Sequence, residues 1–207
     1  MRAAKHVGGE ATNLAIHTKK GNTPRGHDHR IQWLELFDTC VSNTGTIETH
    51  SMPPFDQLGL SATYDPFDPE AISTIEAKIK GAMIFEDTVV TCRYNTATNL
   101  NLLCQAVNAV TGWSLTVEEA MISVRRCVNL LRVFNIRNGI GGELDAPSVR
   151  YGSTPIDGPL AGRGIMPHWN KMIQDYYRLM GWDEKGTPLP ETLRSLGLED
   201  IIPNLRG

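Results

Sequence analysis

Two helix-start signals, each followed by a long apolar stripe, constrain the fold of this chain more than any other feature. Asp68-Pro69-Glu70 places an N-cap residue, a first-turn proline and a first-turn acid in succession. Thr116 and Glu119 form the Thr-x-x-Glu pattern of a capping box. The first signal is followed by apolar residues at steps of three and four: Ile72, Ile75, Ile79, Ala82, Met83 and Val90. The patterns predict one helix from residue 68 to about 91, and a long helix from residue 116 through 134 that stops near Asn138-Gly139.

Shorter helices are expected over residues 31–41, 100–110, 168–180 and 190–197, where apolar spacing and turn residues agree. Residues 1–30, 53–69 and 139–166 are rich in glycine, proline or polar residues and are predicted to be loops. No segment has strand-like alternation. The sequence therefore predicts an all-α fold with long loops.

The composition narrows the class of protein. At 207 residues with a formal net charge of −3, the chain has room for one large or two small domains and no electrostatic signature of a nucleic-acid or membrane partner. No apolar run reaches the length of a membrane span, of about 18 residues. The start carries a basic residue without a following apolar region, so we expect a cytoplasmic protein.

The four cysteines are too widely spaced for a zinc ribbon or a redox pair. In a cytoplasmic chain of this size, reduced thiols are expected rather than two disulfides, and each is ordinarily a small buried hydrophobe. They stand at Cys40, Cys92, Cys104 and Cys127.

Three short stretches occur in an order and spacing that cover nearly the whole chain. The first contains Ile16-His17-Thr18-Lys19, Pro24, Asp28, Arg30 and Ser42-Asn43-Thr44-Gly45. The second is Asp87-Thr88-Val89-Val90-Thr91-Cys92, and the third comprises residues 126–135, 176–183 and 196–198. Together they resemble the C-terminal, helix-rich part of the aldehyde ferredoxin oxidoreductase family of tungstopterin enzymes.

This resemblance implies that residues 1–207 form the C-terminal helical domains of the aldehyde ferredoxin oxidoreductase fold. Two helical subdomains, 1–92 and 93–207, are one division of this region. The family's N-terminal pterin-binding domain and its three clustered cysteines are absent from the sequence. We therefore expect the isolated chain to bind neither pterin nor cluster.

The second stretch carries the implied cofactor contacts. In the family, the counterpart of Cys92 is the last of four thiolate ligands to a 4Fe-4S cluster, and that of Asp87 hydrogen-bonds a pterin ring. Thr91 stands where the family has leucine or isoleucine, and Val90 where it has glycine. Arg93 is a candidate contact for a pterin phosphate. Without the resemblance, Asp87 and Arg93 have the simpler interpretation of solvated side chains.

Glu48 and His50 are the candidate catalytic residues. By colinear counting they occupy the places of a histidine and a lysine that face the metal in aldehyde oxidoreductases. Both side chains are competent for proton transfer. The alternative is that they are inert loop residues.

The N-terminal basic segment between His17 and Arg30 is open to several interpretations. His27-x-His29 is weak evidence for either a metal site or an RNA contact. The string from Lys19 to Arg30 is also similar to the tungsten subunit of class II benzoyl-CoA reductases, where basic loop residues could face the phosphates of coenzyme A.

The first functional hypothesis is an oxidoreductase, or the C-terminal part of one, with tungstopterin (bis-molybdopterin) and a 4Fe-4S cluster. Its substrate would be an aldehyde, a carboxylate or an aromatic acyl-CoA. Electrons would pass to ferredoxin or to an iron-sulfur partner subunit, and the N-terminal part of the enzyme would be a further partner. The alternative is a non-catalytic helical module, either truncated or acting as a subunit that completes a separate pterin-binding chain. Neither hypothesis involves nucleic acid.

Overall fold

The computed structural model describes residues 2–24, 26–46, 48 and 55–205. These residues form helices joined by loops and turns, and they contain no β-strand beyond two isolated bridges. The all-α prediction is thus confirmed. No helix in this part of the chain is long and apolar enough to cross a membrane.

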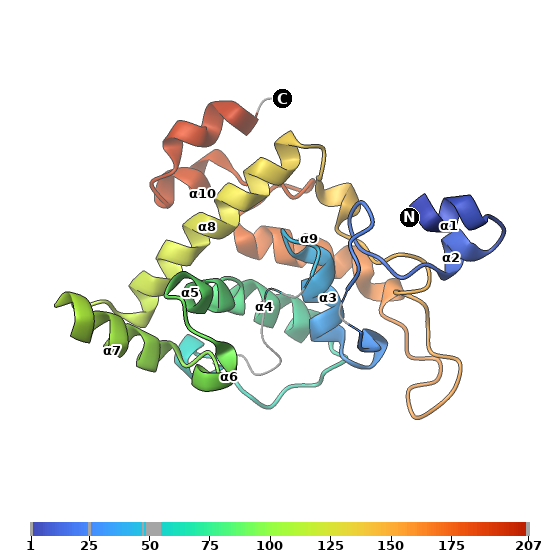
Figure 1. Ribbon diagram of the computed structural model, residues 1–207, viewed down its shortest axis with the longest axis horizontal. Coiled ribbons are helices and arrows are strands. Elements are labelled where there is room, and N and C mark those ends of the chain that lie inside the picture. Colours follow the sequence, from blue (N-terminus) through green and yellow to red (C-terminus); the bar gives the residue numbers. More distant parts are fainter. Residues whose placement is uncertain (1, 25, 47, 49–54, 206–207) are drawn as a thin grey trace.

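One core packs α3 (Trp33–Val41), α4 (Pro69–Ile79) and α9 (Trp169–Met180) against one another. Figure 1 shows α4 and α9 running side by side, with α3 across them. Aromatic rings dominate the contact: Phe37 lies 5.3 Å from Trp169 and 5.6 Å from Tyr176, measured between ring centroids. Edge-to-face pairs of this kind add specific geometry to the burial of apolar area.

A second core joins α5 (Ala82–Thr88), α7 (Leu100–Thr111) and the first half of α8 (Val117–Arg137). Ile84 packs against both cores. Each core contains residues from both sides of residue 92, and the division of the chain at that position stays a prediction.

The long helix α8 is the diagonal of the molecule (Figure 1). Its capping box forms as predicted, with the Thr116 hydroxyl accepting from the Glu119 amide and the Glu119 carboxylate accepting from Thr116. α7 packs near the N-terminal end of α8. α10 (Pro190–Ser195) and the 3-10 helix η5 (Glu199–Leu205) lie near the other end, as both views show.

The predicted helix over residues 68–91 is wrong at its middle. It divides into α4 and α5 at Lys80 and Gly81, where Gly81 adopts φ +102°. A Cβ atom at Gly81 would lie 2.9 Å from Cγ2 of Val124, so glycine also permits the close approach of α8. The break turns Lys80 into the interior.

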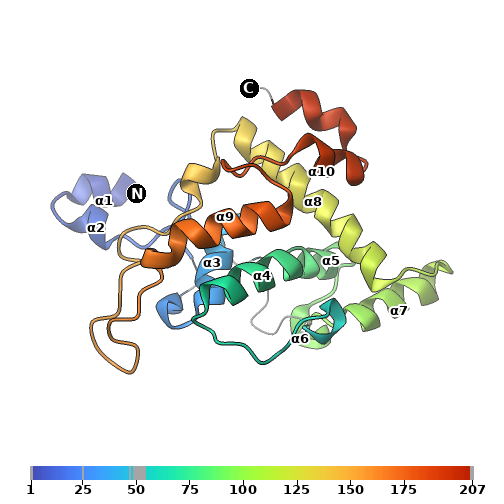
Figure 2. The same cartoon turned by 180° about the vertical axis from the view of Figure 1, so that it is seen from behind.

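The remaining helix predictions hold with small shifts in their ends, and several short helices were not predicted. The predicted N-terminal loop contains α1 (Arg2–Val7), α2 (Ala11–Leu14) and the 3-10 helix η1 (His29–Ile31). α1 and α2 lie at one edge of the molecule in both views (Figures 1 and 2). Elsewhere, α6 (Arg93–Thr96) and four 3-10 segments were not predicted: η2 (Asp56–Leu58), η3 (Gly142–Leu144), η4 (Met166–His168) and η5.

Candidate functional site

The segment after α3, which carries the Ser-Asn-x-Gly motif, is held by side chains from distant parts of the chain. Asn43 donates from Nδ2 to the carbonyl of Val128 at 3.2 Å, and its own carbonyl accepts from Nδ2 of Asn135 at 2.7 Å. The Thr18 hydroxyl donates to the carbonyl of Gly45 at 2.6 Å. α8 and the N-terminal segment therefore fix this loop from two sides.

Glu48 is buried at the end of this segment, in a cluster of charges around Lys80. The Lys80 ammonium lies 2.9 Å from Asp38, 3.0 Å from Glu48 and 3.2 Å from Glu76. The other carboxylate oxygen of Glu48 accepts from the Thr44 amide at 3.0 Å, and the Glu48 amide donates to Asp38 at 2.8 Å. Glu48 is thus fixed through both its side chain and its backbone.

The Lys80 cluster holds three buried carboxyl groups and one ammonium. Burial alone would lower the pKa of Lys80, but Asp38, Glu48 and Glu76 outweigh it and raise that pKa well above its ordinary value. Burial, followed by the negative charge of Asp38, raises the pKa of Glu76 well above its ordinary value. The Lys80 ammonium opposes this shift, because a nearby positive charge favours the ionised carboxylate.

A second buried cluster surrounds Asp145. Its carboxylate contacts the ammonium of Lys19, the guanidinium of Arg132 at 2.8 Å and the hydroxyl of Tyr177 at 2.7 Å. Burial lowers the pKa of Lys19, and Asp145 opposes that shift. Lys19, from the first motif, therefore joins the N-terminal segment to the loop after α8.

The second motif lies at the surface, between the end of α5 and the start of α6. Asp87, Thr91 and Cys92 are exposed, and Arg93 is half-buried. The Thr91 amide and hydroxyl both contact the carbonyl of Glu86, at 3.2 Å each. Val90 adopts φ +59°, a backbone conformation that favours glycine, and it is the position at which the resemblance implies a glycine in the family.

The predicted site residues that the structure describes fall into two groups, Glu48 and the segment 87–93. Among the described residues, no hydrogen bond or ion pair links Glu48 to residues 87–93. His50 lies outside the described residues. The roles of all these residues stay predictions.

Asp38, Glu76 and Lys80 were not singled out from the sequence. Glu76 and Lys80 are four residues apart on a predicted helix, a spacing that ordinarily marks an exposed ion pair. One sequence feature could have indicated that the two residues are buried. Glu76 and Lys80 lie within the apolar stripe of the predicted helix, and Lys80 directly precedes Gly81.

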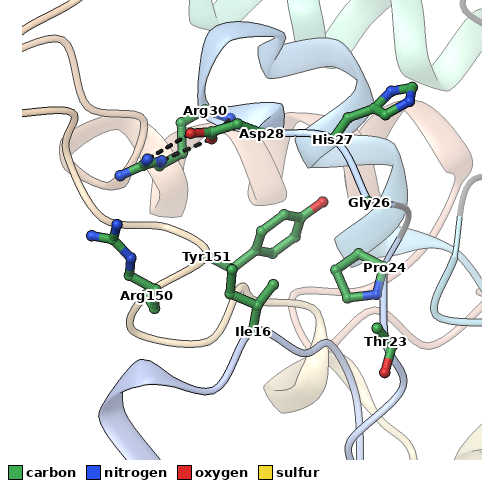
Figure 3. Close-up of a pocket in the computed structure, with 9 residues that line it drawn as sticks. All are labelled: Ile16, Thr23, Pro24, Gly26, His27, Asp28, Arg30, Arg150 and Tyr151. Atoms are coloured by element: carbon green, nitrogen blue, oxygen red, sulfur yellow. Dashed lines mark hydrogen bonds and ion pairs between the residues drawn. The ribbon is translucent and has the colours of Figure 1, made fainter.

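A cavity of 380 Å³ lies between the N-terminal segment and Tyr151. Figure 3 shows the guanidinium groups of Arg30 and Arg150 on the same side of it. Arg30 is paired with Asp28, with an Nη2–Oδ2 distance of 2.6 Å, whereas His27 is exposed. Arg30 and Arg150 therefore give the cavity a basic wall, and the Asp28 carboxylate neutralises part of its positive charge.

All four cysteines are free. Cys40 and Cys104 are buried, as expected for structural thiols, and Cys127 is half-buried. Burial raises the pKa of Cys40 well above its ordinary value, which makes it a poor metal ligand or nucleophile. Cys92 is the exposed thiol of the four.

Comparison with solved structures gives the class of fold. The chain is similar to a chain of the active-site complex BamBC of benzoyl coenzyme A reductase, solved in complex with 1,5-dienoyl-CoA, with a TM-score of 0.72. The similarity covers 96% of this chain and 35% of that one, at 17% sequence identity. The fold is thus a helical region also found within a larger enzyme chain.

Sequence comparison then gives the family. Residues 1–198 match the family model described as aldehyde ferredoxin oxidoreductase, domains 2 and 3, and the chain belongs to that family. It is 28% identical over 144 residues to the tungsten-containing aldehyde ferredoxin oxidoreductase of Pyrococcus horikoshii, and 29% identical over 144 residues to that of Pyrococcus abyssi. Each match covers 65% of this chain, which spans 23% of the length of either relative.

Proposed function

We propose that this chain is the helical part of a tungsten-dependent oxidoreductase and supplies one wall of its active site. The family match supports the class of enzyme. The observation that carries the proposal is the segment from Asp87 to Arg93, at the surface between α5 and α6. It presents an exposed carboxylate, an exposed thiol and a half-buried guanidinium within seven residues, although its neighbours pack into the second core.

These residues fit part of the expected cofactor set. Cys92 has a free, exposed thiol, which can serve as one thiolate ligand to a 4Fe-4S cluster. The other cysteines are not grouped with it, so three further ligands must come from another part of the enzyme. Asp87 can accept hydrogen bonds from pterin N–H groups, and Arg93 can donate to a phosphate. The bound tungstopterin and cluster would supply two-electron chemistry and single-electron transfer.

Within the chain, we assign Glu48 and His50 to proton transfer. Glu48 is held by the Thr44 amide and Lys80, and its position is therefore set before any substrate binds. Glu76 contacts the same Lys80 ammonium at 3.2 Å, so both carboxyl groups share one buried cation. In this proposal the cluster positions Glu48, while ferredoxin or an iron-sulfur partner subunit exchanges the electrons.

An aromatic acyl-CoA is the substrate class that we favour over an aldehyde or a carboxylate. The cavity beside Arg30 and Arg150 offers guanidinium groups suited to the phosphates of coenzyme A. The fold similarity to a benzoyl coenzyme A reductase complex agrees with this choice but shows the fold alone. The alternative function is a non-catalytic helical subunit that completes a separate pterin-binding chain.

The test uses the enzyme assembled from this chain and the pterin-binding part. Cys92→Ser should lower the iron and sulfide content and slow electron transfer, because serine is a poor cluster ligand, whereas Cys127→Ser should not. Asp87→Asn should weaken pterin retention. Glu48→Gln and His50→Gln should keep the tungsten content and lower turnover by about 10²- to 10⁴-fold.

Metal analysis and turnover on the same preparations separate the outcomes. A normal cluster in Cys92→Ser, or full activity in both Glu48→Gln and His50→Gln, would contradict the assignments. Failure of every assembly to retain tungsten would favour the non-catalytic subunit.

A further inference from the structure

We propose that His27, His29 and Glu35 form a binding site for a divalent transition metal ion, at the rim of the cavity beside Tyr151. This site is separate from the residues assigned to pterin and cluster, and it does not depend on the proposed oxidoreductase function. Zn²⁺ is the ion that the donor set fits most simply.

The ligand atoms are already close to metal-binding distances. One ligand atom from each of the three side chains lies within 4.8 Å of the others, and His29 Nε2 lies 3.5 Å from Glu35 Oε2. Zinc binds histidine nitrogen and carboxylate oxygen at about 2.0–2.2 Å in a tetrahedron, which places two ligands about 3.4 Å from each other. The His29–Glu35 edge therefore has the right length, and His27 has only a short distance to close.

The local fold explains why these residues converge. Asp28 caps η1 by accepting from the Arg30 amide, and this turn places His27 and His29 on the same side, with ring centroids 6.0 Å apart. Glu35 lies in the first turn of α3, directly after this turn. His29 and Glu35 are buried and fixed, whereas His27 is exposed on a loop and is free to adjust.

Tyr151 supplies the outer contact that a metal-binding histidine requires. Its hydroxyl is hydrogen-bonded to Nδ1 of His29, which leaves Nε2 as the ring nitrogen directed at Glu35. Burial raises the pKa of Tyr151 above its ordinary value, so the phenol stays neutral. Histidine ligands usually make such a contact through their second nitrogen, because it fixes the tautomer and the ring orientation.

Access and donor type both favour a transition metal. His27 and Tyr151 line the cavity, and in Figure 3 the Tyr151 ring extends into it with its hydroxyl toward the His27 loop. Water can therefore complete the coordination. Two imidazoles and one carboxylate suit Zn²⁺ or Fe²⁺, whereas Mg²⁺ and Ca²⁺ prefer oxygen ligands.

The competing arrangement is a simple His29–Glu35 ion pair, with His27 as a bystander. That arrangement needs a hydrogen on Nε2 of His29, whereas the metal site needs Nε2 without one. The two can be separated because only the metal site depends on His27.

The test is a titration of the chelator-treated, 207-residue chain with Zn²⁺ alone, followed by calorimetry. We expect one Zn²⁺ per chain. His27→Gln should weaken binding by more than tenfold while leaving the fold intact, since His27 is exposed. Glu35→Gln should also weaken binding, and Tyr151→Phe should weaken it by about 10-fold or more. Co²⁺ should give a visible absorption band that His27→Gln abolishes.

His6→Gln is the matched control, because His6 is an exposed histidine outside the site. Cys92→Ser tests whether the exposed thiol is the true ligand, and it should leave the affinity unchanged. Circular dichroism checks the fold of each variant. The absence of saturable binding at one Zn²⁺ per chain, or equal affinity in the parent chain, His27→Gln and Glu35→Gln, would overturn the proposal.

Discussion

Val90 offers a direct test of the backbone at the second motif. Its φ of +59° places a β-branched residue in the left-handed region, and its side chain is 91% exposed. The turn is closed by the Val90 amide, which donates to the carbonyl of Asp87 at 3.1 Å. Replacement by glycine should therefore keep the turn and relieve its steric strain.

The magnitude follows from three contributions. A left-handed conformation costs a non-glycine residue about 1–2 kcal/mol. The gain from relieving this strain is offset by about 0.4–1 kcal/mol, because an unfolded chain with glycine has more conformational entropy to lose on folding. The loss of apolar burial is small for a side chain that is 91% exposed. Val90→Gly should raise the free energy of unfolding by about 0.5–1 kcal/mol, and Tm by about 1–4 °C.

The assay is urea unfolding of the isolated chain, followed by circular dichroism. Val110→Gly is the control, because Val110 is also highly exposed, at 87%, but lies in α7. Glycine there should lower stability by about 0.3 kcal/mol, through its weaker helix propensity. The reasoning is refuted if Val90→Gly destabilises the chain as Val110→Gly does.

Three further predictions concern the interior and the exposed thiol. Lys80→Met should lower the free energy of unfolding by about 3–5 kcal/mol, because it leaves buried carboxylates without their cation. In the same urea titration, Lys171→Met, at an exposed lysine, should change the free energy of unfolding by less than about 0.5 kcal/mol. The raised pKa of Glu76 means that its stabilising effect is complete below its ordinary value of 4.5 and is lost as pH rises through the folded-state pKa. Glu76→Gln should therefore flatten the loss of stability with rising pH, and parallel pH curves for the two proteins would contradict this. Cys92→Ser should leave the Tm of the isolated chain unchanged, whereas Cys40→Ser should lower the Tm by placing a hydroxyl in an apolar core. Equal Tm values for the two variants would contradict this prediction.

Local sequence signals predicted the helices with the clearest ends. The Thr116–Glu119 capping box and the Asp68 cap both form, because their partners lie within three residues along the chain. The break at Gly81 depends instead on Val124 of α8, which is distant in sequence. A glycine inside a helical pattern is often tolerated, and periodicity alone could not reveal this contact.

The candidate site was predictable only in part, for the same reason. The resemblance singled out the Asp87–Cys92 motif, whose role stays a prediction, and the structure places Asp87 and Cys92 at the surface. It did not reveal that Glu48 is buried beside Lys80, because that environment combines a helix, a loop and a second helix. Charged residues look alike in sequence whether they are solvated or enclosed.

The two buried charge clusters contribute more to geometry than to stability. Taking an ammonium and several carboxyl groups out of water costs free energy that their mutual attraction only partly returns, and apolar residues of similar size are often as stable. Asp38, however, binds both the Lys80 ammonium and the Glu48 amide, so the loop after α3 has one position in which all these groups are satisfied. Asp145 does the same for Lys19 and Arg132. An apolar core would tolerate small shifts of these loops, whereas directional hydrogen bonds between buried charges do not, and they hold these side chains in one arrangement.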